Sequence, residues 1–202
     1  MRMSGQDLRS RPPTGEPPAG RPTSGRVSGP RDSAVVLRAL VVDITTLAVD
    51  AIVNAANRFL IPGGGVCGAI HRAAGPGLAL ACERLGGCPV GEARLTEGFG
   101  LAARLVIHAV GPMWQGGEAG EAKLLASAYR SALLLANEHR CRRIAFPAIG
   151  TGIFGFPVGR ATRIAVGTVR ETLARGSSLD EVIFACFRPE VLAAYRGEGV
   201  TG

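Results

Sequence analysis

The sequence predicts an α/β fold, a three-layer α/β/α sandwich built around a central sheet. Short runs rich in Val, Ile, Leu and Ala, each bounded by turn residues, indicate strands, and helical patterns separate them. Because these runs are apolar almost throughout, we expect helices to cover both faces of the sheet. The length of 202 residues suits one such domain.

The expected strands follow one another from about residue 33 onward. They are the apolar runs Val35–Val42, Ala51–Ala55, Arg104–Val110, Arg143–Ala148 and Val182–Phe187. A further strand or hairpin arm is expected at Thr96–Ala103, where periodicity does not decide between the two.

The expected helices lie between these strands. They are Gly68–Ala74, Pro76–Leu85, Glu118–Glu138, Pro157–Arg175 and Pro189–Tyr195. Pro76, Pro157 and Pro189 suit the first turn of a helix, where a backbone N–H has no intrahelical partner.

The first 32 residues differ from the rest of the chain. They hold six of the 13 prolines, and no apolar periodicity runs through them. We therefore expect a disordered tail over residues 1–32 and one folded domain over residues 33–202.

Composition excludes several classes of protein. With 47% hydrophobic and 19% charged residues, the chain can build a core without a disulfide framework. No apolar run approaches the roughly 18–20 residues that span a bilayer, and the N-terminal stretch lacks the apolar segment of a secretory signal. The five cysteines are odd in number and widely spaced, so we expect reduced thiols in a cytoplasmic protein without membrane contact.

The net charge of +7 invites a nucleic-acid interpretation that the pattern does not support. Only Lys123 among the 23 basic residues is a lysine, which indicates a compositional bias toward arginine. Six arginines against three acids give the first 32 residues a charge of +3, leaving +4 for the domain. Because no dense basic stripe with interleaved aromatic residues is present, we expect no sequence-specific nucleic-acid binding.

Three loops follow expected strands, where open α/β sheets bind ligands. They are the Asn54–Asn57 segment running into Gly63-Gly-Gly65, the Gly150–Pro157 segment, and the strand end at Phe187. Glycines at the start of a helix let backbone amides approach a polyanion closely. Neither a P-loop nor a G-x-G-x-x-G fingerprint is present, but two facing glycine loops would bind a diphosphate.

These motifs, in this order, resemble those of a macro domain. The motifs are Val42-Asp-Ile-Thr45, Val49-Asp-Ala-Ile-Val-Asn-Ala-Ala-Asn57, Gly63-Gly-Gly-Val66, Ala69-Ile-His-Arg-Ala-Ala-Gly75, Val106-Ile-His-Ala-Val-Gly-Pro112 and Ile144-Ala-Phe-Pro-Ala-Ile-Gly-Thr-Gly-Ile-Phe-Gly-Phe-Pro157. The resemblance extends from about Val36 to Phe187 and is greatest to the MacroD-like branch, commonly described as ADP-ribose or O-acetyl-ADP-ribose hydrolases. It implies a mixed, mostly parallel sheet with ADP-ribose bound in a cleft at the strand ends.

The resemblance also implies roles for single residues. Asp43 would accept a hydrogen bond from the adenine amino group, beside Ile44 in the adenine pocket. Asn57 would bind the distal ribose hydroxyls and act in catalysis, and Asn54 would support its loop. Phe187 would flank the adenosine.

The two glycine loops would bind the diphosphate through their backbone amides. The amides are those of Gly64, Gly65 and Val66 for one phosphate, and of Gly150, Thr151, Gly152, Ile153 and Phe154 for the other. Phe154 would also pack on the distal ribose.

Local structural roles are the alternative for several of these residues. Asp43 is also suited to capping the turn that follows it, and the asparagines are suited to binding loop backbone. A structural hydrogen-bonding role is expected for His71 and a satisfied core position for His108. The cysteines and histidines lack zinc-ligand spacing, so we expect no metal site, and no cofactor is expected either.

One position departs from the family pattern. MacroD-like proteins have an aspartate, thought to orient the attacking water, where this chain has Cys67. A thiol with a pKa of about 8.5 is mostly neutral at pH 7 and accepts hydrogen bonds poorly. Two functions therefore compete: a hydrolase of ADP-ribosylated proteins or O-acetyl-ADP-ribose, with lowered activity, and an ADP-ribose reader without turnover. Cys67 as a covalent nucleophile is disfavoured because no activating base is evident.

The expected partners follow from the resemblance. They are ADP-ribose or O-acetyl-ADP-ribose and mono-ADP-ribosylated proteins, bound by a monomer.

Overall fold

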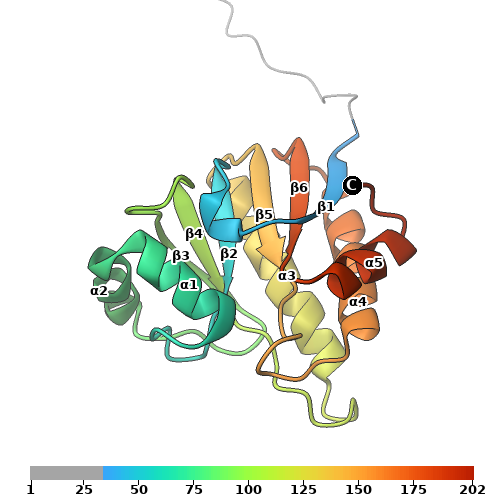
Figure 1. The fold of residues 1–202 in the computed structure, drawn as a ribbon, viewed down its shortest axis with the longest axis horizontal. Coiled ribbons are helices and arrows are strands. Elements are labelled where there is room, and N and C mark those ends of the chain that lie inside the picture. The colour runs from blue at the N-terminus through green and yellow to red at the C-terminus, as the bar shows by residue number, and fades with distance from the viewer. Residues whose placement is uncertain (1–33) are drawn as a thin grey trace, which may run out of the picture. The chain divides into compact units, whose positions relative to one another are not determined.

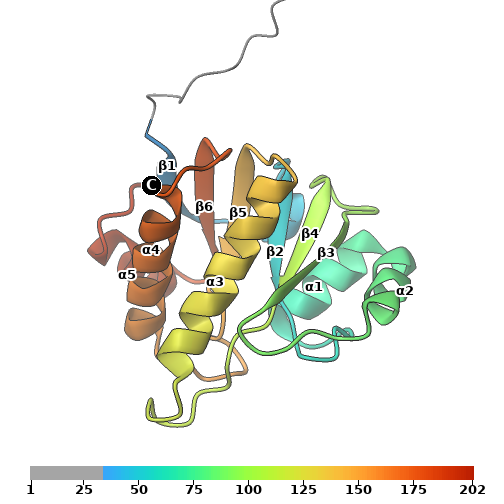
Figure 2. The same ribbon diagram turned by 180° about the vertical axis from the view of Figure 1, so that it is seen from behind.

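The computed structural model describes residues 34–202, and the expected tail over residues 1–32 lies outside them. The described residues form a six-stranded sheet with helices on both faces (Figures 1 and 2). The strands are β1 (Val36–Val41), β2 (Ala51–Ala55), β3 (Ala93–Glu97), β4 (Leu105–Ala109), β5 (Arg143–Pro147) and β6 (Glu181–Cys186). The helices are the short 3₁₀ turn η1 (Ile44–Thr46), α1 (Gly65–Ala74), α2 (Pro76–Leu85), α3 (Glu121–Glu138), α4 (Val158–Leu173) and α5 (Pro189–Gly197). The predicted α/β/α sandwich is confirmed.

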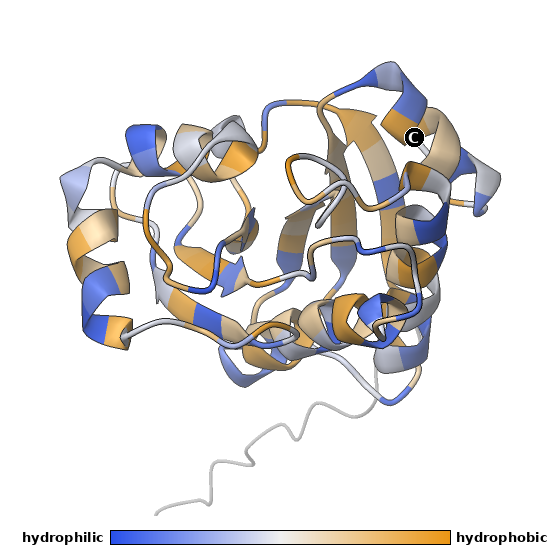
Figure 3. Cartoon of the chain, turned by 90° about the horizontal axis from the view of Figure 1, so that it is seen from below, coloured by the Kyte–Doolittle hydropathy of each residue, from blue (hydrophilic) through white to orange (hydrophobic). Residues whose placement is uncertain are grey.

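The sheet is mixed and mostly parallel. Its strand order is β1-β6-β5-β2-β4-β3, and every neighbouring pair is parallel except β3 and β4. The parallel strands therefore end at one edge of the sheet, which is the lower edge in Figure 1 and faces the viewer in Figure 3. At this edge Asn54 of β2 lies directly beside His108 of β4.

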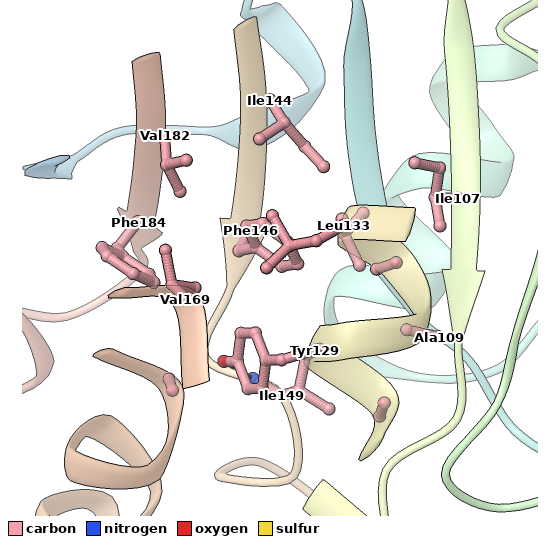
Figure 4. Packing of buried hydrophobic residues seen from close by; sticks show 14 of the residues in the cluster. Ile107, Ala109, Tyr129, Leu133, Ile144, Phe146, Ile149, Val169, Val182 and Phe184 are labelled. Carbon is pink, nitrogen blue, oxygen red and sulfur yellow. Dashed lines mark hydrogen bonds between the residues drawn. The ribbon is translucent and has the colours of Figure 1, made fainter. Parts of the chain in front are cut away.

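Successive strand residues pack into two separate cores, one on each face of the sheet. The core under α3 and α4 contains Phe146 and Phe184, with Leu133 of α3 and Val169 of α4 packed against them (Figure 4). The core under α1 and α2 takes the alternate strand residues, such as Ile52, Val106 and Ile183. This alternation fixes which side chains of β2 and β4 point toward α1.

The expected hairpin arm at Thr96–Ala103 is placed differently in the structure. The strand is β3, which begins at Ala93 and ends at Glu97, and the residues after it form a turn. The turn is closed by hydrogen bonds from Gly98 N–H to the Arg104 carbonyl (2.8 Å) and from Leu101 N–H to the Gly98 carbonyl (3.1 Å). A Cβ at Gly98 would lie 1.9 Å from the Ala103 carbonyl oxygen, so the tight reversal requires glycine there.

Helix α1 begins three residues earlier than the sequence indicates. Gly65 is its first residue and has a φ of 58°, which a side chain would strain, and Gly64 precedes it as the N-cap. The glycine triplet is thus the start of a helix, and Val66 and Cys67 lie in its first turn.

Within residues 34–202, no helix has the length and apolar character needed to cross a membrane. All five cysteines are free thiols and all are buried.

The stability of the α3/α4 core tests this description. Phe146 is fully buried, with its ring centroid 5.1 Å from that of Tyr129 and 6.4 Å from that of Phe184. Phe146→Ala should lower the free energy of unfolding by about 3–5 kcal/mol, because it removes a large side chain that the rigid sheet cannot replace. Urea denaturation measures this loss. Leu134→Ala, on the exposed side of α3, is the control and should change stability by less than about 0.5 kcal/mol; equal losses would contradict the packing described.

Candidate functional site

A cleft with two connected chambers opens at the carboxyl edge of the sheet. The asparagine chamber, of about 270 Å³, is lined among others by Asn57, Gly64, Cys67, Gly111, Gly150 and Phe154. The aspartate chamber, of about 650 Å³, is lined among others by Asp43, Ile44, Arg72, Thr151, Phe187 and Arg188. Both chambers share a wall made of Gly65, Val66, Ala148 and Gly152. The structure thus brings the two predicted glycine loops together at the junction of the chambers.

The first glycine loop contributes the unpaired amides of a helix start. The first N–H groups of an α-helix have no intrahelical acceptor, and here they belong to Gly65, Val66 and Cys67. They carry the positive end of the helix dipole. This end of α1 therefore favours an anion at the shared wall.

The second glycine loop is a tight turn over residues 150–156. It is closed by hydrogen bonds from Phe156 N–H to the Gly150 carbonyl and from Gly155 N–H to the Gly152 carbonyl, both 2.9 Å. Among the described residues, the N–H groups of Gly152, Ile153 and Phe154 meet no protein acceptor. Thr151 differs from the expectation, because its N–H donates to the Ala148 carbonyl at 3.2 Å.

The two loops touch each other in the wall of the asparagine chamber. A Cβ at Gly64 would lie 2.9 Å from Cδ1 of Ile153, so the absent side chain at position 64 makes room for the isoleucine. Ile153 is otherwise 76% exposed. Both residues line the asparagine chamber.

A buried carboxylate fixes the segment that supports the second loop. Oε1 of Glu121 accepts hydrogen bonds from Gln115 N–H (2.9 Å) and Gly117 N–H (3.0 Å). Backbone hydrogen bonds, from Glu121 itself and then from these two residues, hold the pKa of this carboxyl below its usual value. In the same segment Trp114 N–H donates to the Phe154 carbonyl at 2.8 Å, so the position of the second loop is set from outside the cleft.

Asp43 caps η1 and also lines the aspartate chamber. Its Oδ1 accepts from the N–H of Thr45 at 2.9 Å and from the Thr45 hydroxyl at 2.8 Å, as the structural alternative expects. The cap uses one carboxylate oxygen, and Oδ2 takes no part in it. On the same chamber Phe187 is 91% exposed, whereas Ile44 is buried.

The two asparagines lie at different depths. Asn57 lines the asparagine chamber, and its amide also holds its own loop: Oδ1 accepts from Phe59 N–H (3.1 Å), and Nδ2 donates to the Ile61 carbonyl (2.7 Å). Asn54 is buried beneath the chamber, with Nδ2 3.1 Å from His108 Nδ1. Asn54 therefore supports the site from the core, whereas Asn57 faces the chamber.

Cys67 meets no acid or base in the chamber. Its sulfur lies 3.7 Å from Nδ2 of Asn54 and 3.8 Å from the Ile61 carbonyl oxygen. The thiol is buried apart from its contribution to the chamber wall. These neighbours offer no group that would take its proton.

A layer of buried polar side chains lies beneath the asparagine chamber. His108 is at its centre: Nδ1 accepts from Asn54, and Nε2 donates to the Thr96 hydroxyl at 3.0 Å, since that hydroxyl donates to the Glu97 carbonyl. Cys82 Sγ is 3.6 Å from the same Nε2. Burial, together with the charge of His71, lowers the pKa of His108 to about 3, so this histidine is neutral at pH 7.

His71 belongs to the same layer but differs from His108. Its ring centroid lies 6.4 Å from that of His108, and burial lowers its pKa as well. Neither ring nitrogen of His71 has a hydrogen-bond partner among the described residues. The satisfied core position expected for His108 is confirmed, whereas the hydrogen-bonding role expected for His71 is wrong.

Sequence reasoning did not identify Thr96 and Cys82 as part of this layer. The expected arm begins at Thr96, whereas β3 begins at Ala93, so the facing of Thr96 is not evident from the sequence. Cys82 belongs to none of the sequence motifs. Within residues 34–202, no three or more His, Cys, Asp or Glu side chains are grouped so as to hold a metal ion.

The sheet order and the two glycine loops at the carboxyl edge define a class of α/β fold with a ligand cleft. Comparison with known proteins identifies the family. The family model "Macro domain" matches residues 53–165. The chain belongs to the macro domain family.

Individual relatives extend the comparison. The chain is 59% identical over 162 residues to the macro domain-containing protein CT2219 of Chlorobaculum tepidum, covering 80% of this chain and 94% of that protein. It is 52% identical over 167 residues to a Klebsiella pneumoniae protein named O-acetyl-ADP-ribose deacetylase, covering 81% and 95%.

Solved structures give the same family. The Oceanobacillus iheyensis macrodomain with ADP superposes with a TM-score of 0.77 at 38% identity, covering 80% of this chain and 88% of that one. The Trypanosoma brucei macrodomain in complex with ADP-ribose gives 0.76 at 43% identity, covering 81% and 68%.

The buried histidine predicts how stability depends on pH. Between the usual histidine pKa of 6.5 and the folded value of about 3, the unfolded chain binds a proton that folded His108 does not. Stability should therefore fall as pH falls below 6.5, with His108 contributing a slope of up to about 1.4 kcal/mol per pH unit.

Urea denaturation from about pH 7 down to about pH 4 measures this slope. His108→Gln replaces the imidazole with an amide, which can hydrogen-bond but does not titrate, and it should flatten the profile. Leu134→Ala, on the exposed side of α3, changes no titratable group and should leave the slope of the profile unchanged. Identical profiles for wild type and His108→Gln would show that His108 is not buried as a neutral group.

Proposed function

We propose that this macro domain binds ADP-ribose and hydrolyses an ester at its distal ribose. The reaction would release acetate from O-acetyl-ADP-ribose or ADP-ribose from a modified acidic side chain. One observation carries the proposal: unpaired backbone N–H groups of two loops, at the start of α1 and in the 150–156 turn, line a wall shared by two chambers. A diphosphate between two nucleoside-sized halves matches that arrangement.

The residues that line the two chambers support one orientation of the ligand. The adenosine would occupy the aspartate chamber, where Asp43 Oδ2 would accept from the adenine amino group, with Ile44 and Phe187 as apolar walls. The distal ribose would occupy the asparagine chamber, beside Asn57 and Phe154. A carboxylate accepting from an amino group excludes bases that present an acceptor there.

The chemistry requires a water molecule at the ester carbonyl. In deacetylation the water oxygen bonds to the acetyl carbon, the bond from that carbon to the ribose oxygen breaks, and the ribose oxygen takes a proton as acetate leaves. Asn57 would orient the distal ribose. Cys67 presents a thiol, a poor hydrogen-bond acceptor, at the position where the resemblance to MacroD-like proteins implies a carboxylate. Water positioning would therefore fall to Asn57 and the bound phosphate, and we expect slow turnover.

The environment of Cys67 also favours a second candidate, an ADP-ribose reader without turnover. Among residues 34–202, the polar contacts of the sulfur are with the Asn54 amide and the Ile61 carbonyl oxygen, and neither group is a base. The relatives named O-acetyl-ADP-ribose deacetylase, at 52% identity, support the hydrolase. For either function we propose a monomer in a reducing cytoplasm acting on mono-ADP-ribosylated proteins, in keeping with five free thiols.

Asp43 provides the first test of the binding mode. Asp43→Ala should weaken ADP-ribose binding by about 10- to 100-fold, because it removes a charge-assisted hydrogen bond worth about 1.5–3 kcal/mol. Isothermal titration calorimetry measures the change. Thr45→Val removes the hydroxyl that pairs with the same carboxylate but keeps the carboxylate, so it is the matched control and should preserve affinity. If both variants lose affinity only in proportion to lost stability, Asp43 is a cap and no more.

Cys67 provides the test of catalysis. Cys67→Asp should raise O-acetyl-ADP-ribose hydrolysis by about 10²–10⁴-fold, the contribution of a positioned general base, with little change in ADP-ribose affinity. Cys82→Ser changes another buried cysteine outside the chamber and is the control. A reader would bind in every variant and turn over in none except Cys67→Asp. If Cys67→Ser abolishes a robust wild-type activity, the thiol itself takes part in the reaction. That result would contradict the proposal that Asn57 and the bound phosphate position the water.

A further inference from the structure

The aspartate chamber is larger and more basic than an adenosine requires. Its volume of about 650 Å³ is more than twice the 270 Å³ of the asparagine chamber. The AMP half of ADP-ribose, however, has fewer than twice as many atoms as the ribose-phosphate half. Adenosine also carries no negative charge, yet two arginines, Arg72 and Arg188, line this chamber.

Arg72 is directed along α1 toward the cleft. Its Nη1 would lie 3.1 Å from a Cβ at Gly68, one turn earlier in the helix, so the guanidinium occupies space that the glycine leaves open. A helical side chain that leans toward the N-terminus brings its charged end over the preceding turn. Among residues 34–202, no carboxylate lies within ion-pair distance of Arg72.

Arg188 lines the same chamber from the N-cap position of α5. It precedes α5 and directly follows Phe187, the exposed ring at the adenosine end. Its Nε is 3.1 Å from Oε1 of Glu190, with both side chains more than half exposed. An exposed ion pair of this kind is weak, so a phosphate can replace the carboxylate as partner.

Resting on the function proposed above, we propose that the aspartate chamber binds ADP-ribose with an additional phosphate beyond its adenosine ribose. Arginine presents a planar fork that matches phosphate oxygens, and an arginine near the adenosine accommodates the 2′-phosphate in dinucleotide-binding folds. Such a ligand is ADP-ribose that is phosphorylated on the 2′-hydroxyl of its adenosine ribose. Asp43 and Glu190 are the acids near this end, and the two guanidinium groups offset them.

Calorimetry with two probes tests the proposal on the intact chain. ADP-ribose 2′-phosphate should bind about tenfold more tightly than ADP-ribose, and the ratio should shrink as salt is added. The double variant Arg72→Gln/Arg188→Gln should bring the ratio close to one. Arg84→Gln removes the same charge from the exposed end of α2 and should preserve the wild-type ratio.

The remaining outcomes separate the alternatives. A wild-type ratio of one or below overturns the inference. A double variant that weakens both ligands equally does so too, because the arginines then serve the diphosphate. Failure of ADP-ribose itself to bind would contradict the proposed function instead.

Discussion

The close approach of two backbone segments at the carboxyl edge of the sheet is the constraint on which the site depends. The start of α1 and the 150–156 turn meet where the side chain of Ile153 packs against Gly64. Each segment has backbone N–H groups without partners among the described residues. Positive φ values at Gly65 and Gly150 aim these groups. Unpaired amides cost free energy unless water or a ligand accepts their hydrogen bonds. Because the fold already orients these amides, an anion can bind without rearrangement of the backbone.

Beneath this site, the core is built around neutral histidines. His108 orders Asn54 and Thr96 through opposite ring nitrogens, and Asn54 in turn touches the sulfur of Cys67. The chamber floor is thus connected to the sheet by hydrogen bonds that require His108 to stay uncharged. The same contacts stabilise the α1/α2 layer and fix the geometry of the asparagine chamber. Acid should therefore affect both together.

The sequence predicts most strands of this molecule better than it predicts the edge strand β3, the start of α1 and the long-range side-chain contacts. The interior strands β2, β4, β5 and β6 follow from apolar runs, because burial on both faces selects such residues whatever their neighbours. The edge strand β3 contains Arg94 and Thr96 and lacks that signal, and the start of α1 was missed because glycine is a poor helix former that serves here as a cap. The cleft residues came from ordered motifs. The partners of His108 come from three separate elements, and neither spacing nor composition brings such long-range contacts to light.

The central claim is that two sets of backbone amides bind a diphosphate that joins two chambers. Calorimetry comparing ADP-ribose with AMP tests it most directly, because AMP can fill the aspartate chamber but lacks the second phosphate and the distal ribose. The account predicts that AMP binds far more weakly than ADP-ribose. Equal affinity for the two ligands would contradict it and would reduce the site to an adenosine pocket.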